Sequence, residues 1–218
     1  MHKLFTGDGF LFIEVFCQRI ERLAVVLENL NFSVNTGEQV TLTGRTGTGK
    51  STVFKLLLSQ YRSWKGKVLL YDKDAALLPD SVKRQLFGYV EQKFRMVPGS
   101  ILDQITLFDV NIGLEAAIKA AKTVGLHDTI AAFKNGYDTI CDPSLFSQGQ
   151  WQLLSIARAI AAEPKILLLD EITANLDADT EQTVLTALKN ASENRTVLSI
   201  SHRLYQQTGG RQISIGTE

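Results

Sequence analysis

The chain has 218 residues, of which 44% are hydrophobic and 21% charged, so it is long enough to bury a sizeable core. Its 23 basic residues balance 23 acidic ones, which gives no electrostatic sign of a nucleic-acid-binding surface, and no nucleic-acid partner is expected. Two widely separated cysteines favour neither a disulfide framework nor a zinc site. No apolar run approaches the roughly 20 residues that cross a bilayer, so we expect any membrane-spanning part to be a separate chain or segment.

Short β-type runs alternate with longer helical patterns, which predicts an α/β fold with a mostly parallel sheet. In chain order we predict a strand at 40–43, a helix at 50–58, strands at 66–71 and 87–90, helices at 112–124, 127–133 and 150–162, a strand at 166–169, a helix at 177–190, and strands at 196–201 and 211–215. Asn111 is the expected cap of the helix at 112–124. The middle helices are interpreted as a lobe inserted into the α/β body.

A glycine-rich stretch lies between the first predicted strand and the first predicted helix. Residues 44–51 fit the P-loop pattern G-x-x-x-x-G-K-[ST], in which backbone N–H groups surround phosphate oxygens at a helix N-terminus. The residues predicted to bind nucleotide here are Gly44, Arg45, Thr46, Gly47, Thr48, Gly49, Lys50, Ser51 and Thr52. Lys50 would reach the β- and γ-phosphates and Ser51 would ligate Mg²⁺. The pattern alone indicates a nucleoside triphosphate, since kinases and GTPases share it.

Two carboxylates end the apolar strand at 166–169. A carboxylate at the carboxyl end of a parallel strand lies beside the P-loop in such folds, so Asp170 is predicted to hold Mg²⁺, directly or through water. Glu171 follows at once and is predicted to polarise the attacking water. This sequence therefore predicts hydrolysis of the bound triphosphate.

The pentapeptide Phe146-Ser147-Gln148-Gly149-Gln150 and the helix after it resemble the LSGGQ signature of ABC (ATP-binding cassette) ATPases. The resemblance implies a P-loop NTPase of ABC type, with a mostly parallel sheet core, an inserted helical signature subdomain and an N-terminal β subdomain. It also implies that Ser147, Gly149 and Gln150 close over the ATP held by the P-loop of a second cassette.

Further stretches follow in the order found in that family. Gln92 resembles the Q-loop glutamine, which contacts Mg²⁺ and the attacking water and senses the membrane domain. Residues 174–177 resemble the D-loop, which crosses the dimer interface. His202 is similar to the switch histidine that contacts the γ-phosphate, and residues 97–105 look like the exporter-type segment that meets coupling helices.

The resemblance covers about residues 26–203 and implies one domain over residues 1–218. Its core would span about 26–92 and 163–218, and its helical subdomain about 93–162. Phe146 and Gln148 replace the consensus Leu and Gly of the signature. Residues 140–145 are shorter than the loop that usually touches the membrane domain. Phe16 is the nearest aromatic candidate for stacking on adenine, although core packing is its other possible role.

Together these features predict the ATP- and Mg²⁺-dependent motor of a membrane exporter. Its partners would be a second cassette, identical or related, and a transmembrane domain, fused or separate, which would hold the chain at the cytoplasmic side of the cell membrane. Two alternatives stay open: an ABC ATPase outside transport, and a regulatory cassette that binds ATP without turnover. Export is favoured over import only by the similarity of these segments to exporter-type family members. The cargo is unspecified.

Overall fold

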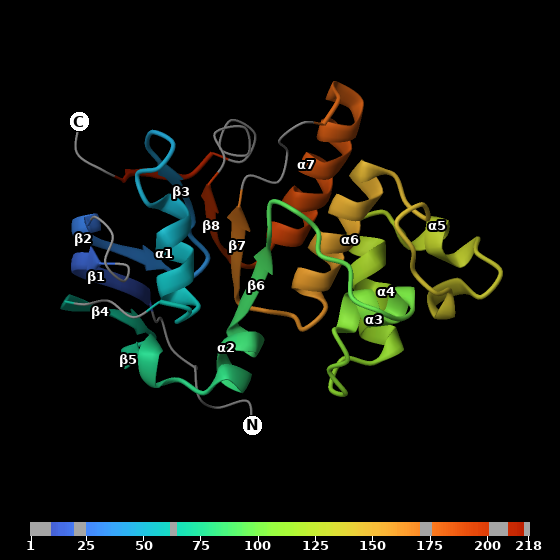
Figure 1. Ribbon diagram of the computed structural model, residues 1–218, viewed down its shortest axis with the longest axis horizontal. Coiled ribbons are helices and arrows are strands. Elements are labelled where there is room, and N and C mark those ends of the chain that lie inside the picture. Colours follow the sequence, from blue (N-terminus) through green and yellow to red (C-terminus); the bar gives the residue numbers. More distant parts are fainter. Residues whose placement is uncertain (1–9, 20–24, 62–64, 171–175, 201–208, 216–218) are drawn as a thin grey trace. The chain divides into compact units, whose positions relative to one another are not determined.

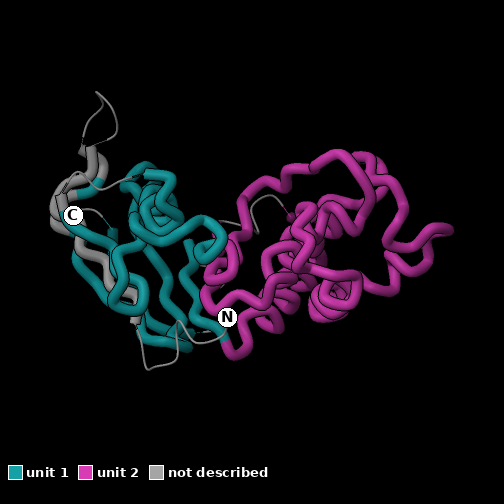
Figure 2. Tube along the Cα trace, turned by 90° about the horizontal axis from the view of Figure 1, so that it is seen from below, with its two compact units in different colours: residues 1–83, 195–218 teal, residues 84–194 magenta. Residues whose placement is uncertain are grey.

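The computed structural model (Figure 1) describes residues 10–19, 25–61, 65–170, 176–200 and 209–215. The chain forms two compact units (Figure 2): Met1–Lys83 with Arg195–Glu218, and Arg84–Asn194. The subdomain boundaries that the sequence suggests, near residues 93 and 162, stay a prediction. Each unit is described by itself below.

An antiparallel sheet forms one part of the first unit. Its strand order is β2 (Val25–Asn35), β1 (Phe10–Arg19), β4 (Lys65–Leu70) and β5 (Lys73–Asp74). A single 3-10 turn, η1 (Ala75–Leu77), follows β5. The strand predicted at 66–71 is confirmed with a shift of one residue, whereas β1, β2 and β5 were not predicted. β1 and β2 lie in the N-terminal β subdomain, which was expected only as a whole, and β5 has two residues, too few for an alternating pattern to indicate a strand.

The P-loop strand lies in a parallel ladder of the same unit. β3 (Gln39–Thr43) pairs with β8 (Thr196–Ile200) on one side and with β9 (Arg211–Ser214) on the other. Val40 and Leu42 are each 1% exposed, and the buried hydroxyls of Thr41 and Ser199 lie 2.8 Å apart in a hydrogen bond. A strand held from both sides in this way cannot shift its register, so its carboxyl end is fixed.

The helix after β3, α1 (Lys50–Leu57), buries one side. Val53, Phe54 and Leu57 are fully buried, and the helix predicted at 50–58 is confirmed. The strand–loop–helix order expected around the P-loop is therefore present.

The second unit contains a short parallel pair of strands, β6 (Phe87–Val90) and β7 (Ile166–Asp170), together with several helices. The central helix is α6 (Gln148–Ile160), which contacts α3, α4, α7 and β6 (Figure 1). The other elements are α2 (Asp80–Leu86), α3 (Ile101–Thr106), α4 (Leu114–Thr123), α5 (His127–Ala131), η2 (Gly136–Asp138) and α7 (Ala178–Ser192). Leu154, Ile156 and Ala157 are completely buried, so α6 is the core of this unit.

Two predicted helix starts are wrong, and side-chain hydrogen bonds explain both. Gly113, not Asn111, precedes α4, because Asp109 Oδ1 accepts hydrogen bonds from the backbone N and the side-chain Nδ2 of Asn111 at 2.9 and 2.8 Å. The signature helix begins at Gln148 rather than Gln150. There Ser147 Oγ accepts from the Gln150 amide and Gln150 Oε1 accepts from the Ser147 amide, a reciprocal cap.

The carboxyl end of α6 packs directly on β6 at a glycine. A Cβ added to Gly88 would lie 2.3 Å from the carbonyl oxygen of Ala159 and 2.9 Å from Pro164 Cγ. We therefore predict that Gly88→Ala lowers the unfolding free energy by about 1–3 kcal/mol, because the backbone must move to admit one methyl group. Urea denaturation measures the loss.

The comparison variant is Gly113→Ala, whose added Cβ meets nothing within 4 Å. It should cost about 0.5–1 kcal/mol, because alanine is a poorer N-cap residue than glycine, and the backbone need not move. Equal denaturation midpoints for Gly88→Ala and the wild type would contradict the close packing of α6 on β6.

Candidate functional site

The P-loop turn depends on glycines with left-handed backbone. Gly44, Gly47 and Gly49 have φ angles of 140°, 86° and 93°. An L side chain is strained at such angles. A Cβ on Gly44 would also lie 2.4 Å from the carbonyl oxygen of Ile215, whereas one on Gly47 would meet nothing within 4 Å. The loop is thus tight at its base and open at its middle.

The groups that this loop presents suit a polyphosphate. Gly49 gives α1 no side-chain cap, so the positive end of the helix is left for an anion. Lys50 Nζ donates to the carbonyl oxygens of Gly44 and Arg45, both at 2.8 Å, which holds the ammonium group at the loop. Ser51 is exposed and Thr52 is buried. An ammonium group, a helix N-terminus and a hydroxyl are together the donor set that a triphosphate with Mg²⁺ requires.

Asp170 ends β7 in the second unit, and a tyrosine from the neighbouring strand donates to it. Tyr89 Oη lies 3.2 Å from Asp170 Oδ2. Burial, followed by the negative charge of Asp170, raises the pKa of Tyr89, so the phenol stays protonated and can donate. The sequence analysis missed Tyr89. The available signal was a tyrosine one residue before the end of β6, the strand that pairs with the strand ending in Asp170.

The signature pentapeptide forms the start of α6. Ser147 and Gln148 are exposed, whereas Gly149 is buried. The Ser147 hydroxyl accepts one hydrogen bond in the cap, and a hydroxyl in that role still has a proton to donate. Gln150 is half-buried, and its side-chain oxygen completes the cap. These residues therefore form a capped helix N-terminus in which Ser147 and Gln148 are exposed.

An aromatic cluster explains the Phe at the first signature position. Phe146 is 6% exposed, and its ring meets those of Trp151 and Phe133 edge-on at centroid distances of 5.0 and 5.7 Å. Trp151 in turn lies 4.9 Å from the ring of Phe94. Phe146 thus fills a space between helices, which accounts for a residue larger than the consensus Leu.

The segment after Gln92 is held on α6 by polar contacts. Gln92 itself is exposed, and its carbonyl oxygen accepts from Gln152 Nε2 at 3.3 Å. Arg158 Nη1 donates to the carbonyl oxygen of Arg95 at 2.9 Å, and its guanidinium lies 4.1 Å from the ring of Phe94.

Arg158 also joins this segment to α3. Its Nε donates to the carbonyl oxygen of Gln104 at 2.5 Å, and burial lowers the pKa of the guanidinium to about 10, so it remains charged at neutral pH. Gln152 and Arg158 are positioning residues that the sequence analysis missed, because they read as ordinary members of a helix pattern.

Several predicted residues lie outside the described part of the chain. These are Glu171, His202 and residues 174–175 of the D-loop-like stretch. Phe16 lies in β1, and its side chain is also outside the described part. Their roles stay predictions.

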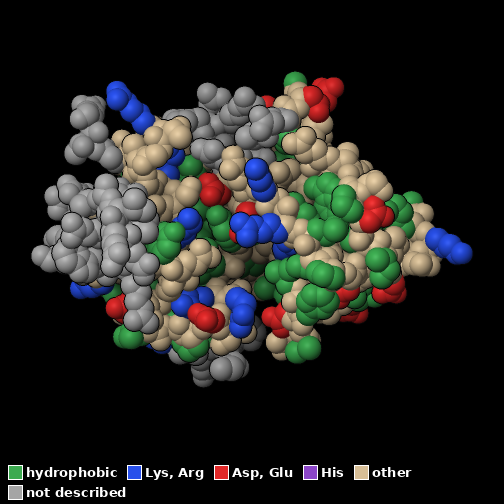
Figure 3. All heavy atoms as spheres, in the orientation of Figure 1, with side chains coloured by type: hydrophobic (Ala, Val, Ile, Leu, Met, Phe, Trp, Pro, Cys, Tyr) green, Lys and Arg blue, Asp and Glu red, His purple; other side chains and the backbone are tan. Residues whose placement is uncertain are grey.

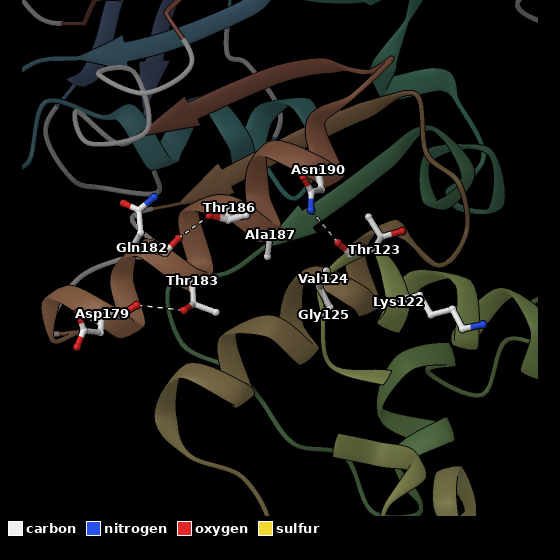
Figure 4. A pocket seen from close by; sticks show the side chains of 10 residues that line it. All are labelled: Lys122, Thr123, Val124, Gly125, Asp179, Gln182, Thr183, Thr186, Ala187 and Asn190. Carbon is white, nitrogen blue, oxygen red and sulfur yellow. Dashed lines mark hydrogen bonds between the residues drawn. The ribbon is translucent and has the colours of Figure 1, made fainter. Parts of the chain in front are cut away.

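One groove of about 460 Å³ lies between the end of α4 and α7 (Figure 4). Asn190 Nδ2 donates across it to the carbonyl oxygen of Thr123 at 3.3 Å. Its ten lining residues include none of the residues predicted to bind nucleotide or metal.

Hydrophobic side chains gather on the surface of the helical second unit (Figure 3). Val110 is 96% exposed, Phe108 60% and Leu107 49%. Within the described ranges, no helix is both long enough and apolar enough to span a bilayer.

Comparisons with known proteins agree on one family. The family model described as ABC transporter matches residues 27–174. The chain is 42% identical over 184 residues to ABC transporter B family member 26, chloroplastic, of Arabidopsis thaliana, covering 82% of this chain and 26% of that protein. It is 39% identical over 183 residues to the alpha-hemolysin translocation ATP-binding protein HlyB of Escherichia coli O157:H7, covering 83% and 26%.

A solved structure with a similar fold is that of a bacterial Atm1-family ABC exporter with ATP bound. The TM-score is 0.84 at 30% sequence identity, and the match covers 98% of this chain and 38% of that one. The chain thus spans about a quarter of the length of these curated relatives.

The Tyr89 hydrogen bond generates a prediction about metal dependence. Tyr89→Phe removes a donor that fixes one carboxylate oxygen of Asp170. We expect the Mg²⁺ concentration for half-maximal ATP hydrolysis to rise about two- to tenfold, which is the change in affinity that loss of one hydrogen bond typically causes. A titration of activity with Mg²⁺ at saturating ATP measures it.

Tyr137→Phe is the matched control, since the Tyr137 hydroxyl bonds to His127 Nδ1 at 3.0 Å and not to Asp170. It should leave the Mg²⁺ requirement unchanged. Identical Mg²⁺ curves for Tyr89→Phe and the wild type would show that Tyr89 does not position the carboxylate.

Proposed function

This chain belongs to the ABC transporter family of ATPases, and from that premise we propose that it powers export across a membrane, joined to a second cassette and a transmembrane domain. The observation that carries the proposal is that the chain has two helix N-termini of different chemistry, one in each unit. One is the uncapped start of α1 behind the P-loop, and the other is the capped start of α6 at Ser147. Both suit the same anionic ligand.

We assign ATP and Mg²⁺ as the ligands. The P-loop glycines admit phosphate oxygens to the backbone, Lys50 neutralises the β- and γ-phosphates, and Thr52 supports the α-phosphate. Ser51, Asp170 and Gln92 supply oxygen ligands of the kind that Mg²⁺ prefers. When bound, Mg²⁺ would withdraw charge from the phosphate oxygens during hydrolysis.

Hydrolysis requires little covalent chemistry from the protein and much positioning. Glu171 would accept a hydrogen bond from the attacking water and polarise it, and Gln92 would orient the same water. His202 would donate to the γ-phosphate. The hydrogen bond from Tyr89 Oη fixes the orientation of the Asp170 carboxylate.

A second cassette would complete each site. In this arrangement Ser147, Gly149 and Gln150 of one protomer meet the γ-phosphate held by Lys50 of the other. The dipole of α6 and the Ser147 hydroxyl add positive potential there. After hydrolysis, two negatively charged products oppose the closed contact, and opening of the dimer would move the transmembrane domain.

The contact with a transmembrane domain would use the apolar surface made by Leu107, Phe108 and Val110. Leu107 and Phe108 have φ angles of 50° and 61°, a left-handed backbone that costs non-glycine residues about 1–3 kcal/mol each. A strained turn that exposes large apolar side chains is typical of a binding surface. Docking there would hold the chain at the cytoplasmic side of the membrane.

The proposal predicts the behaviour of Glu171→Gln. This variant should bind ATP as the wild type does but hydrolyse it slower by a factor of about 10²–10⁴, the usual contribution of a general base. It should also accumulate as a dimer with Mg·ATP. Steady-state phosphate release and light scattering measure these properties. Turnover equal to that of the wild type would contradict the role of Glu171.

Lys50→Ala separates binding from hydrolysis, because it should lose ATP affinity itself. A wild-type protein that binds ATP without turnover would support the regulatory alternative instead. The export role is tested in the full-length transporter, where both variants should abolish transport.

A further inference from the structure

We propose that Thr180 is a positioning residue that holds the start of α7 against the signature turn of α6, and that Gly149 is a glycine in this chain because the Thr180 methyl group occupies the place of its side chain. This inference rests on the proposed function only for its consequence at the contact between two cassettes. The contact itself lies within one chain.

The geometry of Gly149 carries the first step. A Cβ built on Gly149 would lie 2.3 Å from Thr180 Cγ2, a distance that no pair of methyl groups adopts. The next atoms of Thr180, Cβ and Oγ1, would lie at 3.7 and 3.9 Å, which is ordinary contact. To admit a side chain at position 149, either the Thr180 side chain must rotate or the start of α7 must move.

Backbone conformation does not explain this glycine. Gly149 is the second residue of α6 and does not have the positive φ of the P-loop glycines. It is also buried, although Ser147 and Gln148 before it are exposed. The position is therefore selected by packing against α7, in addition to any approach of a nucleotide from outside.

Thr180 is linked to the D-loop-like stretch through the cap of α7. Asp177, the last residue of that stretch, accepts a hydrogen bond from the Thr180 amide at 3.0 Å through Oδ1. The hydrogen bonds from Thr180 hold the pKa of Asp177 below its usual range, so the cap stays charged. One residue thus contacts the signature with its side chain and the end of the D-loop-like stretch with its backbone.

This arrangement fixes two segments with a single contact. In the proposed dimer, both the signature and the D-loop-like stretch face the partner cassette. A displacement of α7 by an added methyl group at Gly149 would move the second segment relative to the first. Gly149 would then matter even where no nucleotide touches it.

A double-variant experiment in the full chain tests the contact without any need for activity. Gly149→Ala should lower the melting temperature by about 3–8 °C through overpacking. Gly149→Ala with Thr180→Ser lacks the obstructing methyl group and should melt within about 2 °C of Thr180→Ser alone. If Gly149→Ala alone is insoluble, recovery of soluble protein in the double variant is the same result.

The matched control places the same substitution one turn further along α7. Thr183 is exposed, and its hydroxyl donates to the carbonyl oxygen of Asp179. Gly149→Ala with Thr183→Ser should therefore melt like Gly149→Ala alone. Rescue by Thr183→Ser, or no rescue by Thr180→Ser, would overturn the proposed contact.

The positioning role of Thr180 is tested by self-association, measured under conditions in which differences in stability have no effect. In the Glu171→Gln background, at a temperature where every variant is fully folded, Gly149→Ala should weaken Mg·ATP-dependent self-association about tenfold or more. Thr180→Ser should restore most of that loss. Rescue of melting temperature without rescue of self-association would overturn the positioning role.

Failure of the proposed dimer and failure of the contact between Gly149 and Thr180 give different results. If Glu171→Gln protein with an intact Gly149 never self-associates, the proposed dimer fails, while the melting temperatures still decide the contact between Gly149 and Thr180.

Discussion

Burial of α6 is the constraint on which the second unit depends. This helix is the core of its unit, and each part of it holds a different functional segment. Its first turn presents Ser147, Arg158 near its end binds the segment after Gln92, and its carboxyl end packs on Gly88 of β6. Because the helix is rigid and contacts β6, which also carries Tyr89, a shift of α6 would disturb all of these segments together. The signature is therefore best understood as the exposed tip of a core helix.

In the proposed site, the first unit would hold a highly charged ligand on backbone groups. β3 is fixed between β8 and β9, so the turn from Gly44 to Gly49 begins at a defined point and directs the N-terminus of α1. A triphosphate needs charge on more than one side, and one loop supplies only one side. In the proposed dimer, the helix N-terminus at Ser147 of the second cassette would supply positive potential on the other side of the triphosphate.

The strong local patterns were predictable from sequence. The α/β fold of ABC type and the membership of an ATPase family are confirmed, because the P-loop spacing and the signature reflect fixed backbone chemistry. Helix starts were less predictable. Asn111 donates its side-chain hydrogen bond to Asp109 instead of capping α4, and the Ser147 cap starts α6 two residues before the predicted position. Tyr89, Arg158 and Thr180 could not be identified, since their roles arise from contacts between segments distant in sequence. The roles of Glu171 and His202 stay predictions.

In the proposed dimer, the signature turn of one chain completes the ligand site at the P-loop of the other. The most direct test is a structure of hydrolysis-deficient protein with Mg·ATP. We expect two protomers, with Ser147 and Gly149 of each within hydrogen-bonding distance of the γ-phosphate bound at the other's Lys50. A nucleotide-bound protein in which residues 147–149 contact no phosphate of any protomer would contradict it.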